Sequence, residues 1–457
     1  MRAGTPTRFE SCETEGDVAR WSGRFPRSSR IGVLCVVSVL GGLVPARSGA
    51  QDTVAAGVRI GLMYDRTGKP GVAVTPASGA NGDSVRAILA RDLDFSDRIS
   101  VIVPDSGEAP AGALNYPLYA KLSAVAVVQA VVTPAGALHV SVHEVAQKRV
   151  VLVMDMALPA PALSPEWRAV VHAASDSAEW AILGQRGIAG TRVIFRRANQ
   201  LWTIDSDGAA TRPVPGTEGA LSPAWHPSGN RIAYGVLPDP SSRVVVRDLV
   251  IGVTRSFSVA ALNMSPVFSP DGQQVVFAAG SDATDLWVAP SVGTDSPTRL
   301  TSRRGSLNMS PTFSPDGRRI AFTSGLLGHP EVYIMDTDGS SAELLTTSGF
   351  GDQLYRSNPD WSPDGRRVAF QSKINGVYQV MTIAVRDRST QQLTSDGENE
   401  DPSWAPDGRH LVFVSTRSGT RELWLLDTES SRARQLTHGG RVQNPAWSPH
   451  LSLSHQP

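Results

Sequence analysis

The stretch Ser310-Pro311-Thr312-Phe313-Ser314-Pro315-Asp316-Gly317 decides the fold, because variants of it recur along the second half of the chain. The first prolines of the six copies are separated by 43, 45, 48, 43 and 43 residues; they are Pro223, Pro266, Pro311, Pro359, Pro402 and Pro445. A fixed period of roughly 40–50 residues, built from short strands, is typical of a β-propeller. The sequence therefore predicts a ring of similar blades.

One copy can be interpreted physically as one four-stranded blade. Proline opens the first strand, where its missing N–H does not interrupt the ladder. Ser-Pro-Asp-Gly is a tight turn, in which Asp bonds the local backbone and Gly adopts positive φ. Three further strands are expected around 320–322, 332–334 and 344–346. We interpret the repeated Asp residues as turn formers rather than metal ligands, and the repeated Phe and Trp as inter-blade core.

The two ends of the repeat region are expected to close the ring together. The last copy, Pro445-Ala446-Trp447, has no strands after it, whereas Arg192–Phe195 and Gln200–Ile204 resemble second and third strands with no first strand before them. Joining these pieces completes one blade and gives six in total. Closure leaves no free blade edge at either end.

Residues 51–187 lack the repeat and predict a small α/β domain with a mixed sheet. Strands are expected at 58–63, 99–103, 125–132, 138–145 and 150–154, and a Gly-, Pro- and Ser-rich loop at 70–80. Asp83 or Ser84 is expected to cap one helix, Pro117 to begin a short one, and Ser164 to start the last. The expected domains are thus an export signal at 1–50, this α/β domain, and a propeller at 188–457.

An export signal is indicated by Arg27 and Arg30, followed by an apolar run and the small residues Ser48-Gly49-Ala50. Cleavage between Ala50 and Gln51 would remove both cysteines of the chain, so the mature protein would have no disulfide. An uncut N-terminal anchor is the alternative. The balanced charge, close to −3 after cleavage, argues against a nucleic-acid partner and against polybasic attraction to a membrane.

The six copies, the closing Asn444-Pro445-Ala446-Trp447-Ser448-Pro449 and the junction from Leu183 to Val193 resemble the TolB family, periplasmic propellers of the Tol–Pal envelope system. The resemblance covers nearly all of the expected mature chain. It implies a monomeric scaffold without catalytic activity, cofactor or metal, at most peripheral to the membrane. The implied partners are a Pal-like peptidoglycan-associated lipoprotein and a TolA-like inner-membrane protein, in support of outer-membrane integrity and of constriction at cell division.

The resemblance also implies two binding regions. Pal-like lipoproteins would contact the loops that lead into each first strand, at one mouth of the ring; here these are Leu262, Asn263, Met264, Ser265, Leu307, Asn308, Met309, Ser310, Tyr355, Arg356, Ser357, Asn399, Glu400 and Gln443. The TolA-like partner would contact the N-terminal segment at Val58, Arg59, Ile60, Gly61 and Leu62. Leu and Met beside Asn suit a protein-binding rim, although buried Leu and Met between blades are the common case.

Two other functions remain open from the residues alone. One is an exported propeller that binds a sugar or peptide outside the Tol system. The other is a relative of the exopeptidases whose propellers precede a hydrolase domain, but the chain has no Gly-x-Ser-x-Gly nucleophile turn. His139 and His143 lie four apart on an expected strand, which predicts a hydrogen-bonded or solvated pair rather than a zinc site, since a third donor is missing.

Overall fold

The computed structural model describes residues 68–104, 114–237, 242–302, 306–346 and 355–451. Every described residue belongs to one compact unit, Ala56–Pro457. The expected export signal, its cleavage site, the strand at 58–63 and the proposed TolA-like contact residues lie outside the described residues. They remain predictions.

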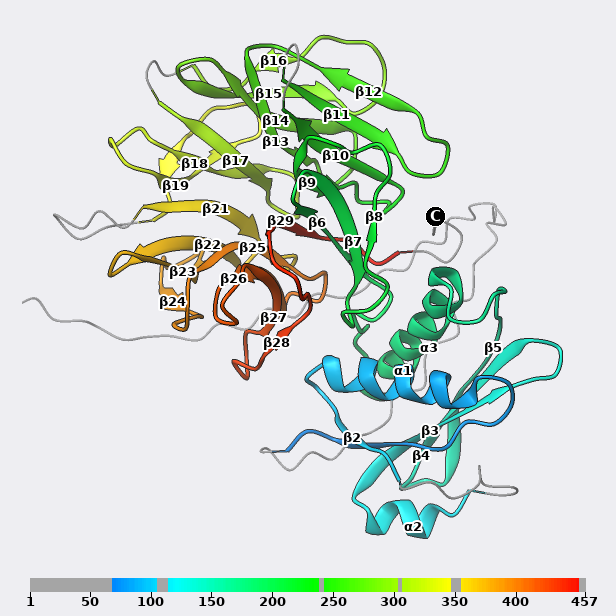
Figure 1. Cartoon of the computed structure of the whole chain (residues 1–457). Coiled ribbons are helices and arrows are strands. Elements are labelled where there is room, and N and C mark those ends of the chain that lie inside the picture. The colour runs from blue at the N-terminus through cyan, green and yellow to red at the C-terminus, as the bar shows by residue number, and fades with distance from the viewer. Residues whose placement is uncertain (1–67, 105–113, 238–241, 303–305, 347–354, 452–457) are drawn as a thin grey trace, which may run out of the picture. The chain divides into compact units, whose positions relative to one another are not determined.

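The first part of the described chain is a five-stranded mixed sheet with helices (Figure 1). Its elements in chain order are β1 (Gly71–Val74), α1 (Gly82–Phe95), β2 (Ser100–Ile102), α2 (Tyr116–Lys121), β3 (Ala124–Val132), β4 (Ala137–Glu144), β5 (Arg149–Ala157) and α3 (Pro165–Leu183). The strand order is β2-β1-β3-β4-β5; β1 pairs in parallel with both its neighbours, and β3, β4 and β5 pair antiparallel. The predicted mixed α/β layer is therefore confirmed.

The start of this sheet corrects two expectations. Residues 71–74 form the buried strand β1, although the surrounding Gly, Pro and Ser residues predicted a loop. Burial of Val72, Ala73 and Val74 outweighs that composition, and Gly71 permits close pairing, since a Cβ there would lie 2.5 Å from the carbonyl oxygen of Ser123. The expected cap of α1 at residue 83 or 84 is also wrong: Asn81 precedes the helix in a left-handed conformation, without a side-chain cap.

The α3 helix begins as its sequence predicts. Ser164 accepts a hydrogen bond at Oγ from the backbone N–H of Trp167 at 3.2 Å, and Pro165 occupies the first turn, where no N–H is needed. Gly184 ends the helix in a left-handed conformation. Val171, Ala174 and other residues of its apolar face join α1 and the sheet in one core.

The rest of the described chain forms six four-stranded antiparallel sheets, the blades of a propeller. Five of them are β9 (Ala220–Trp225), β10 (Arg231–Val236), β11 (Arg243–Asp248), β12 (Thr254–Phe257); β13 (Leu262–Phe268), β14 (Gln274–Gly280), β15 (Thr284–Pro290), β16 (Thr298–Arg299); β17 (Asn308–Phe313), β18 (Arg319–Ser324), β19 (Glu331–Asp336), β20 (Glu343–Leu344); β21 (Arg356–Trp361), β22 (Arg367–Ile374), β23 (Val377–Ala384), β24 (Thr390–Gln392); and β25 (Asn399–Trp404), β26 (His410–Ser415), β27 (Glu422–Asp427), β28 (Ala433–Gln435). The predicted all-β ring with four strands per blade is confirmed.

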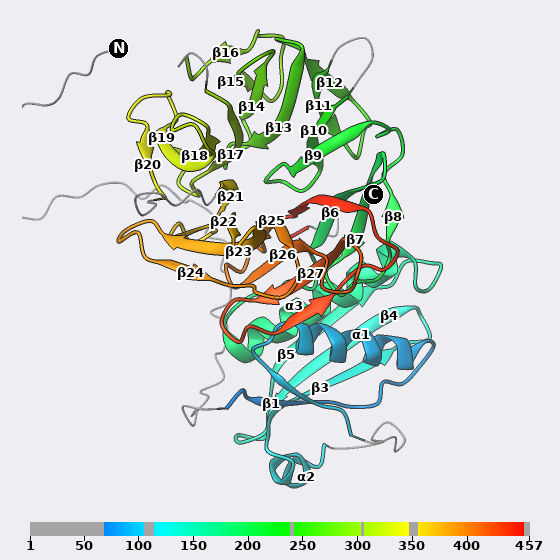
Figure 2. The ribbon, with the colours of Figure 1, turned by 60° about the vertical axis from the view of Figure 1, so that its left-hand side comes forward.

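The sixth blade contains both ends of the repeat region. It consists of β29 (Val442–Trp447), β6 (Arg192–Arg197), β7 (Gln200–Asp205) and β8 (Arg212–Pro213), in that order. Figure 2 shows the red C-terminal strand beside β6, and Trp447 pairs with Val193 in the antiparallel register. The C-terminal strand therefore closes the ring, as the position of the last repeat predicts.

The repeated turn and aromatic residues have the roles that the motif predicts. In one turn Ser314 donates from Oγ to Asp316 at 2.6 Å, and Asp316 accepts from the backbone N–H of Arg318 at 3.1 Å. Gly317 has φ 70°. Five of the six repeated aromatic residues are at least 92% buried between blades, namely Phe268, Phe313, Trp361, Trp404 and Trp447, whereas Trp225 is half-buried against its cluster. The motif thus folds each blade and also supplies the side chains that join it to the next.

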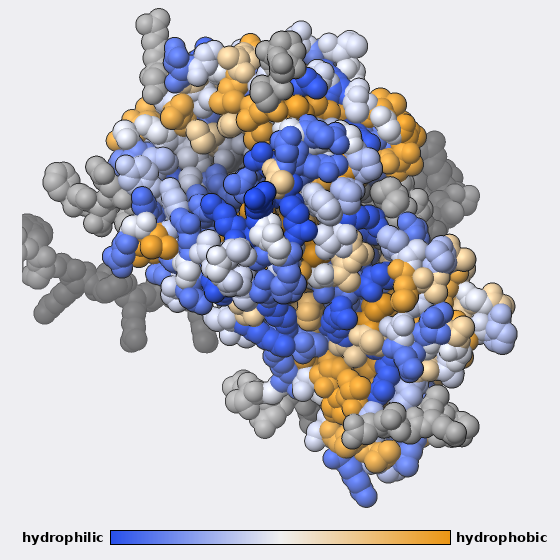
Figure 3. Space-filling view, viewed as in Figure 1, coloured by the Kyte–Doolittle hydropathy of each residue, from blue (hydrophilic) through white to orange (hydrophobic). Residues whose placement is uncertain are grey.

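Hydrophilic residues cover most of the face seen in Figure 3, with smaller hydrophobic patches on both the propeller and the α/β part. One patch is the β11–β12 hairpin at the upper right of Figure 1, where Val250, Ile251 and Val253 are 56, 71 and 61% exposed. Among the described helices none combines the length and apolar character that a membrane crossing requires.

Candidate functional site

The first strands of the six blades surround a channel, and each carries an irregularity at the same place. The residue before the repeated proline has positive φ, between 47 and 53°, in all six: Ser222, Ser265, Ser310, Asn358, Asp401 and Asn444. At each of them the pairing with the next strand shifts register. These six residues line a cavity of about 160 Å³. A left-handed non-glycine residue costs about 1–3 kcal/mol, so its sixfold repetition indicates a positioned ring of polar groups.

Four of these polar residues are joined by hydrogen bonds across consecutive blades. Ser310 donates from Oγ to Oδ1 of Asn358 at 2.9 Å, and Nδ2 of Asn358 donates to Asp401 at 2.6 Å. The backbone N–H of Asn444 donates to the other oxygen of Asp401 at 3.0 Å. Burial raises the pKa of Asp401 against these hydrogen bonds. The chain of contacts connects four separate blades around the channel wall.

A second carboxylate, that of Asp360, lies on β21, two residues after Asn358. Asp360 accepts a hydrogen bond from the backbone N–H of Trp404 at 2.7 Å and one from Thr312 at 3.3 Å. Burial raises the pKa of Asp360 to about 6, although these donors lower it. Asp360 and Asp401 are the acidic residues among those that line the channel cavity. They supply negative charge there when ionised.

The repeated Leu-Asn-Met-Ser residues lie differently from the exposed loop tips that the sequence predicted. Residues 262–265 and 308–310 already belong to strands β13 and β17. Met264 and Met309 are half-buried and pack against one inter-blade cluster. Leu307, in contrast, is 46% exposed. The pairing with β14 and β18 begins earlier than the motif indicates, so the rim at this position is formed by leucine rather than methionine.

The two asparagines of these repeats are buried. Asn263 is 0% exposed and donates from Nδ2 to the carbonyl oxygens of Ser242 and Ala260. Asn308 is 3% exposed and donates to Ser306 at 3.1 Å. The resemblance places Asn263 and Asn308 among the residues that contact a Pal-like lipoprotein, but their amides are buried and bond within the chain, where they hold the starts of β13 and β17.

The remaining predicted residues gather around the same end of the channel with different exposure. Tyr355 is 38% exposed and Lys373 lies 5.7 Å from its ring centroid. Arg356 is buried in an ion pair with Glu331 at 3.2 Å, and Ser357 is half-buried. Asn399 is 0% exposed, whereas Glu400 pairs with Arg421 and Gln443 accepts from Arg196 at 3.0 Å. Leu307 and Tyr355 are thus the exposed large residues of the predicted set.

Basic residues at this mouth escaped the sequence analysis because they lie on second and third strands. Lys373 is on β22, Arg196 on β6 and Arg421 just before β27. The Nε atoms of Arg196 and Arg421 are buried and have no hydrogen-bond partner within the described part of the chain. Aligning the blades at the ends of their strands, instead of at the proline motif, would have identified these side chains as rim residues.

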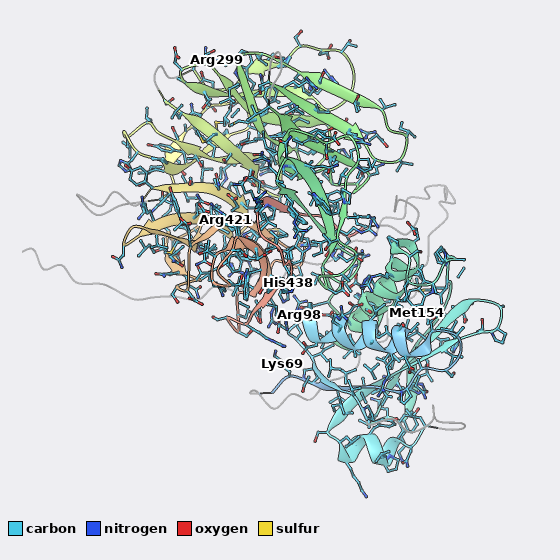
Figure 4. The ribbon with its side chains drawn as sticks, viewed as in Figure 1. Lys69, Arg98, Met154, Arg299, Arg421 and His438 are labelled. Atoms are coloured by element: carbon cyan, nitrogen blue, oxygen red, sulfur yellow. The ribbon has the colours of Figure 1, made fainter. Side chains whose placement is uncertain are left out.

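A separate charged cluster connects α1 and α3 to the blades at the opposite end of the channel. Asp97, directly after α1, is 0% exposed and receives two hydrogen bonds from Arg434, at 2.6 and 2.7 Å. Arg98, labelled in Figure 4, contacts Glu179 of α3 at 3.3 Å and Asp407 of a blade turn at 3.1 Å. Burial raises the pKa of Glu179 to about 7, because the nearby Arg98 compensates only in part. These contacts fix the α/β part to the propeller.

One group of donors in this cluster has the composition of a metal site. Single ligand atoms of Asp92, His172 and Asp207 lie within 4.8 Å of one another. Arg168, however, donates from Nη2 to Asp207 at 2.5 Å and lies 3.2 Å from Nε2 of His172. Burial alone would lower the pKa of His172, but Asp92 and Asp205 raise it to about 10. A protonated imidazole and a guanidinium thus supply the cations here, and this donor set does not fit a metal ion.

The histidines of β4 also have local partners. His139 contacts Asp155 at 2.8 Å, and His143 contacts Tyr116 and Ser141 at 3.0 and 3.1 Å. Each ring is therefore explained by hydrogen bonds between neighbouring strands and α2, as the sequence predicts.

Comparison with protein families matches residues 179–451 of this chain to a model described as PD40, the TolB β-propeller domain. That range contains all six blades together with the end of α3.

Curated relatives and solved structures agree with this match. The Tol-Pal system protein TolB of Methylococcus capsulatus is 30% identical over 226 residues, 46% of this chain and 53% of that protein. The protein of the same name from Gluconobacter oxydans is 28% identical over 302 residues, 62% and 64% of the two chains. The matches thus span between about half and two thirds of these relatives. The crystal structure of TolB from Acinetobacter baumannii superposes with a TM-score of 0.71 at 25% identity, covering 84% of this chain and 97% of that one.

Proposed function

Because this chain belongs to the TolB β-propeller domain family, we propose that it is the periplasmic propeller component of a Tol–Pal system. Its role is to bind partner proteins rather than to catalyse a reaction. Through them it links a Pal-like lipoprotein to a TolA-like inner-membrane protein, supporting outer-membrane integrity and constriction at division. The names of the curated relatives support the system.

The proposed lipoprotein contact rests on the rim of the channel, next to the ring of six polar residues with positive φ. Leu307 and Tyr355 are exposed and lie just before the first strands of two neighbouring blades, β17 and β21, at the same rim. Interfaces concentrate binding energy in a few apolar or aromatic anchors surrounded by polar groups. Glu400, Arg421 and Lys373 provide such a polar surround. A compact partner domain can therefore contact apolar anchors and charged groups at once.

We expect the double variant Leu307→Glu with Tyr355→Ala to lose affinity for a Pal-like lipoprotein by about tenfold or more, because two central anchors are removed. The lipoprotein's soluble domain is titrated against each variant by calorimetry. The matched control is Ile251→Glu, an exposed aliphatic residue of a hairpin at the opposite end of the blades. Unchanged affinity of a folded double variant, or an equal loss in the control, would move the contact to another surface.

The same experiment distinguishes the alternative of a propeller that binds a sugar or peptide outside the Tol system. That alternative requires binding of a small ligand in the channel without capture of a lipoprotein.

We place the TolA-like contact at Val58, Arg59, Ile60, Gly61 and Leu62, on the resemblance alone. Deleting residues 58–62 should abolish binding of a TolA-like domain while the mouth still binds the lipoprotein; retained binding would contradict this assignment.

Export is part of the proposed function, and it predicts a defined N-terminus. We expect the protein recovered from the periplasm to begin at Gln51, because Arg27, Arg30, the apolar run and the small residues before Gln51 suit signal peptidase. Mass spectrometry of the intact purified protein checks the mass. An intact N-terminus in the membrane fraction would show an uncut anchor instead.

A further inference from the structure

The turn between β11 and β12 carries the most exposed large apolar side chains of the described part of the chain. Val250, Ile251 and Val253 are 56, 71 and 61% exposed, whereas Leu249 packs against the inter-blade core and anchors the turn. Figure 3 shows hydrophobic surface at the upper right, where this hairpin projects from the propeller. Exposed apolar residues that gather in one place mark a surface that binds a protein or a membrane.

Blade formation does not require an apolar turn at this place. Residues 249–253 contain four large aliphatic side chains, whereas the corresponding turns between the third and fourth strands of the other five blades contain at most one each. In three of those blades the turns consist of Asp, Glu, Ser, Thr, Gly, Ala and Arg alone; they are residues 206–211, 337–342 and 428–432. The aliphatic residues of this one turn therefore exceed what the fold needs.

The backbone of this turn is hydrogen-bonded within the protein. Asp248 accepts at Oδ1 from the backbone N–H groups of Val250 and Ile251, at 2.9 and 3.0 Å. The N–H of Gly252 donates to the carbonyl oxygen of Asp248 at 3.1 Å, and the N–H of Asp248 donates to that of Val253 at 2.8 Å. Polar groups that are satisfied internally leave water at little cost, so this turn can enter an apolar phase without losing hydrogen bonds.

Two arginines stand behind the apolar tip. The strand register places Arg247 and Arg255 on opposite faces of the hairpin. Both guanidinium groups donate to backbone carbonyl oxygens, which hold them in place without cancelling their charge. Asp248 pairs with Arg231 at 3.2 Å, and Asp295 of the next blade faces Arg255. Three arginines against these two acids leave the base of the tip positive, while the tip itself is uncharged.

A lipid surface fits this element better than a second protein does. Protein interfaces draw most of their energy from Trp, Tyr and Arg side chains, among which Val is under-represented. The tip instead presents three aliphatic side chains on a turn of five residues, 249–253. Acyl chains are apolar and deformable, so they can surround a projecting tip, and the phosphates of anionic lipids complement the arginines behind it.

We propose that the β11–β12 hairpin is a membrane-binding element whose tip, Val250, Ile251 and Val253, enters the interface of an anionic lipid bilayer. Arg247 and Arg255 then face the lipid phosphates, as long basic side chains do beside an immersed apolar group. Two arginines strengthen such binding by only about fivefold each, so the aliphatic tip carries most of it. This surface is independent of the proposed contacts at the mouth, and its test contains no lipoprotein.

The first test is sedimentation of a chain beginning at Gln51 with vesicles of phosphatidylethanolamine and phosphatidylglycerol. We expect the parent chain to bind, and Ile251→Glu to bind about tenfold more weakly or worse, because a charge opposes entry of the tip. The matched control is Leu327→Glu, in the turn between β18 and β19, where Leu327 is 54% exposed; it should bind as the parent chain does. No binding by the parent chain, or equal binding by Ile251→Glu, would overturn the proposal.

The arginines and the alternative of a second copy are tested with the same proteins. Arg247→Gln with Arg255→Gln should weaken binding to these vesicles and reduce its dependence on salt, but leave binding to phosphatidylcholine vesicles unchanged. An unchanged salt dependence would contradict the assigned role of the arginines. Sedimentation velocity without lipid should show the parent chain and Ile251→Glu in the same state. Self-association that Ile251→Glu abolishes would assign the tip to a second copy and overturn the proposal.

A dye on the tip reports insertion directly. Cys12 and Cys35 lie in the expected export signal, so a chain beginning at Gln51 has no thiol and one introduced cysteine can be labelled alone. We expect nitrobenzoxadiazole on Ile251→Cys to emit at shorter wavelength when the vesicles are added, because the dye leaves water. The same dye on Leu327→Cys should keep its emission. No shift at the tip, or equal shifts at both positions, would show that the hairpin does not enter the bilayer.

Discussion

A chain that ends at Asn444 should fail to form a stable propeller. The deletion removes the pairs Ala446–Ile194 and Trp447–Val193, which join β29 to β6. It also removes the Trp447 side chain, which is 6% exposed and donates from Nε1 to Thr191 at 2.8 Å. Loss of one buried Trp side chain costs about 3–5 kcal/mol. Since domains are stable by only about 5–15 kcal/mol, opening the ring as well should unfold it at ordinary temperature.

The measurement is thermal and urea unfolding followed by circular dichroism. A chain ending at Leu451 is the matched control, because it keeps β29 and the buried Leu451. We expect the control to unfold as the full mature chain does, and the shorter chain to show no cooperative transition. A shorter chain with an unchanged midpoint would mean that β29 does not hold the ring closed.

The variant Asp97→Asn should lower the free energy of unfolding by about 3–5 kcal/mol, the usual cost of removing one partner from a buried ion pair. Arg434 donates two hydrogen bonds to this carboxylate, at 2.6 and 2.7 Å, and His410 lies 3.4 Å from it. Asparagine keeps the size of the side chain and tolerates the left-handed backbone at this position, where φ is 55°. The loss therefore reports the charge rather than strain.

The control is Asp94→Asn. Asp94 pairs with Arg432 at 3.1 Å, but its side chain is 41% exposed, and exposed ion pairs contribute about 0–1 kcal/mol. Both variants are compared with the parent chain in urea at pH 7. Equal midpoints for Asp97→Asn and the parent chain would contradict the buried contact between the residues that follow α1 and the blade of β25–β28.

The same variant predicts a change in acid stability. Burial alone would raise the pKa of Asp97, but hydrogen bonds from His410 and Arg434 outweigh it and hold the pKa below the ordinary value of 3.8. A lowered folded-state pKa contributes stability above the unfolded pKa and loses it as the pH falls through the folded pKa. Below about pH 4 the parent chain should therefore lose the stability that the ionised Asp97 contributes, whereas Asp97→Asn has no such contribution to lose. The free energies of unfolding of the two chains should converge as the pH falls.

The repeat itself determined the architecture. Its period predicts blades, its proline, turn and aromatic residues define strands and inter-blade contacts, and its incomplete last copy at Trp447 predicts the closure. Ser164 likewise marks the start of α3 correctly. These predictions succeed because turn geometry, capping and strand periodicity act over a few residues, so neighbouring residues carry the whole signal.

Only the tertiary structure decided which side chains are available for binding. Asn263 and Asn308 read as rim residues, yet their amides are buried among neighbouring strands. Residues 71–74 read as a loop, yet burial between two strands makes them β1. Asp97 and Arg434 are 337 residues apart and meet only because the blades and α1 come together. Burial and ion pairing depend on what the rest of the chain places around a residue, and that environment is not encoded in the residue's own neighbourhood.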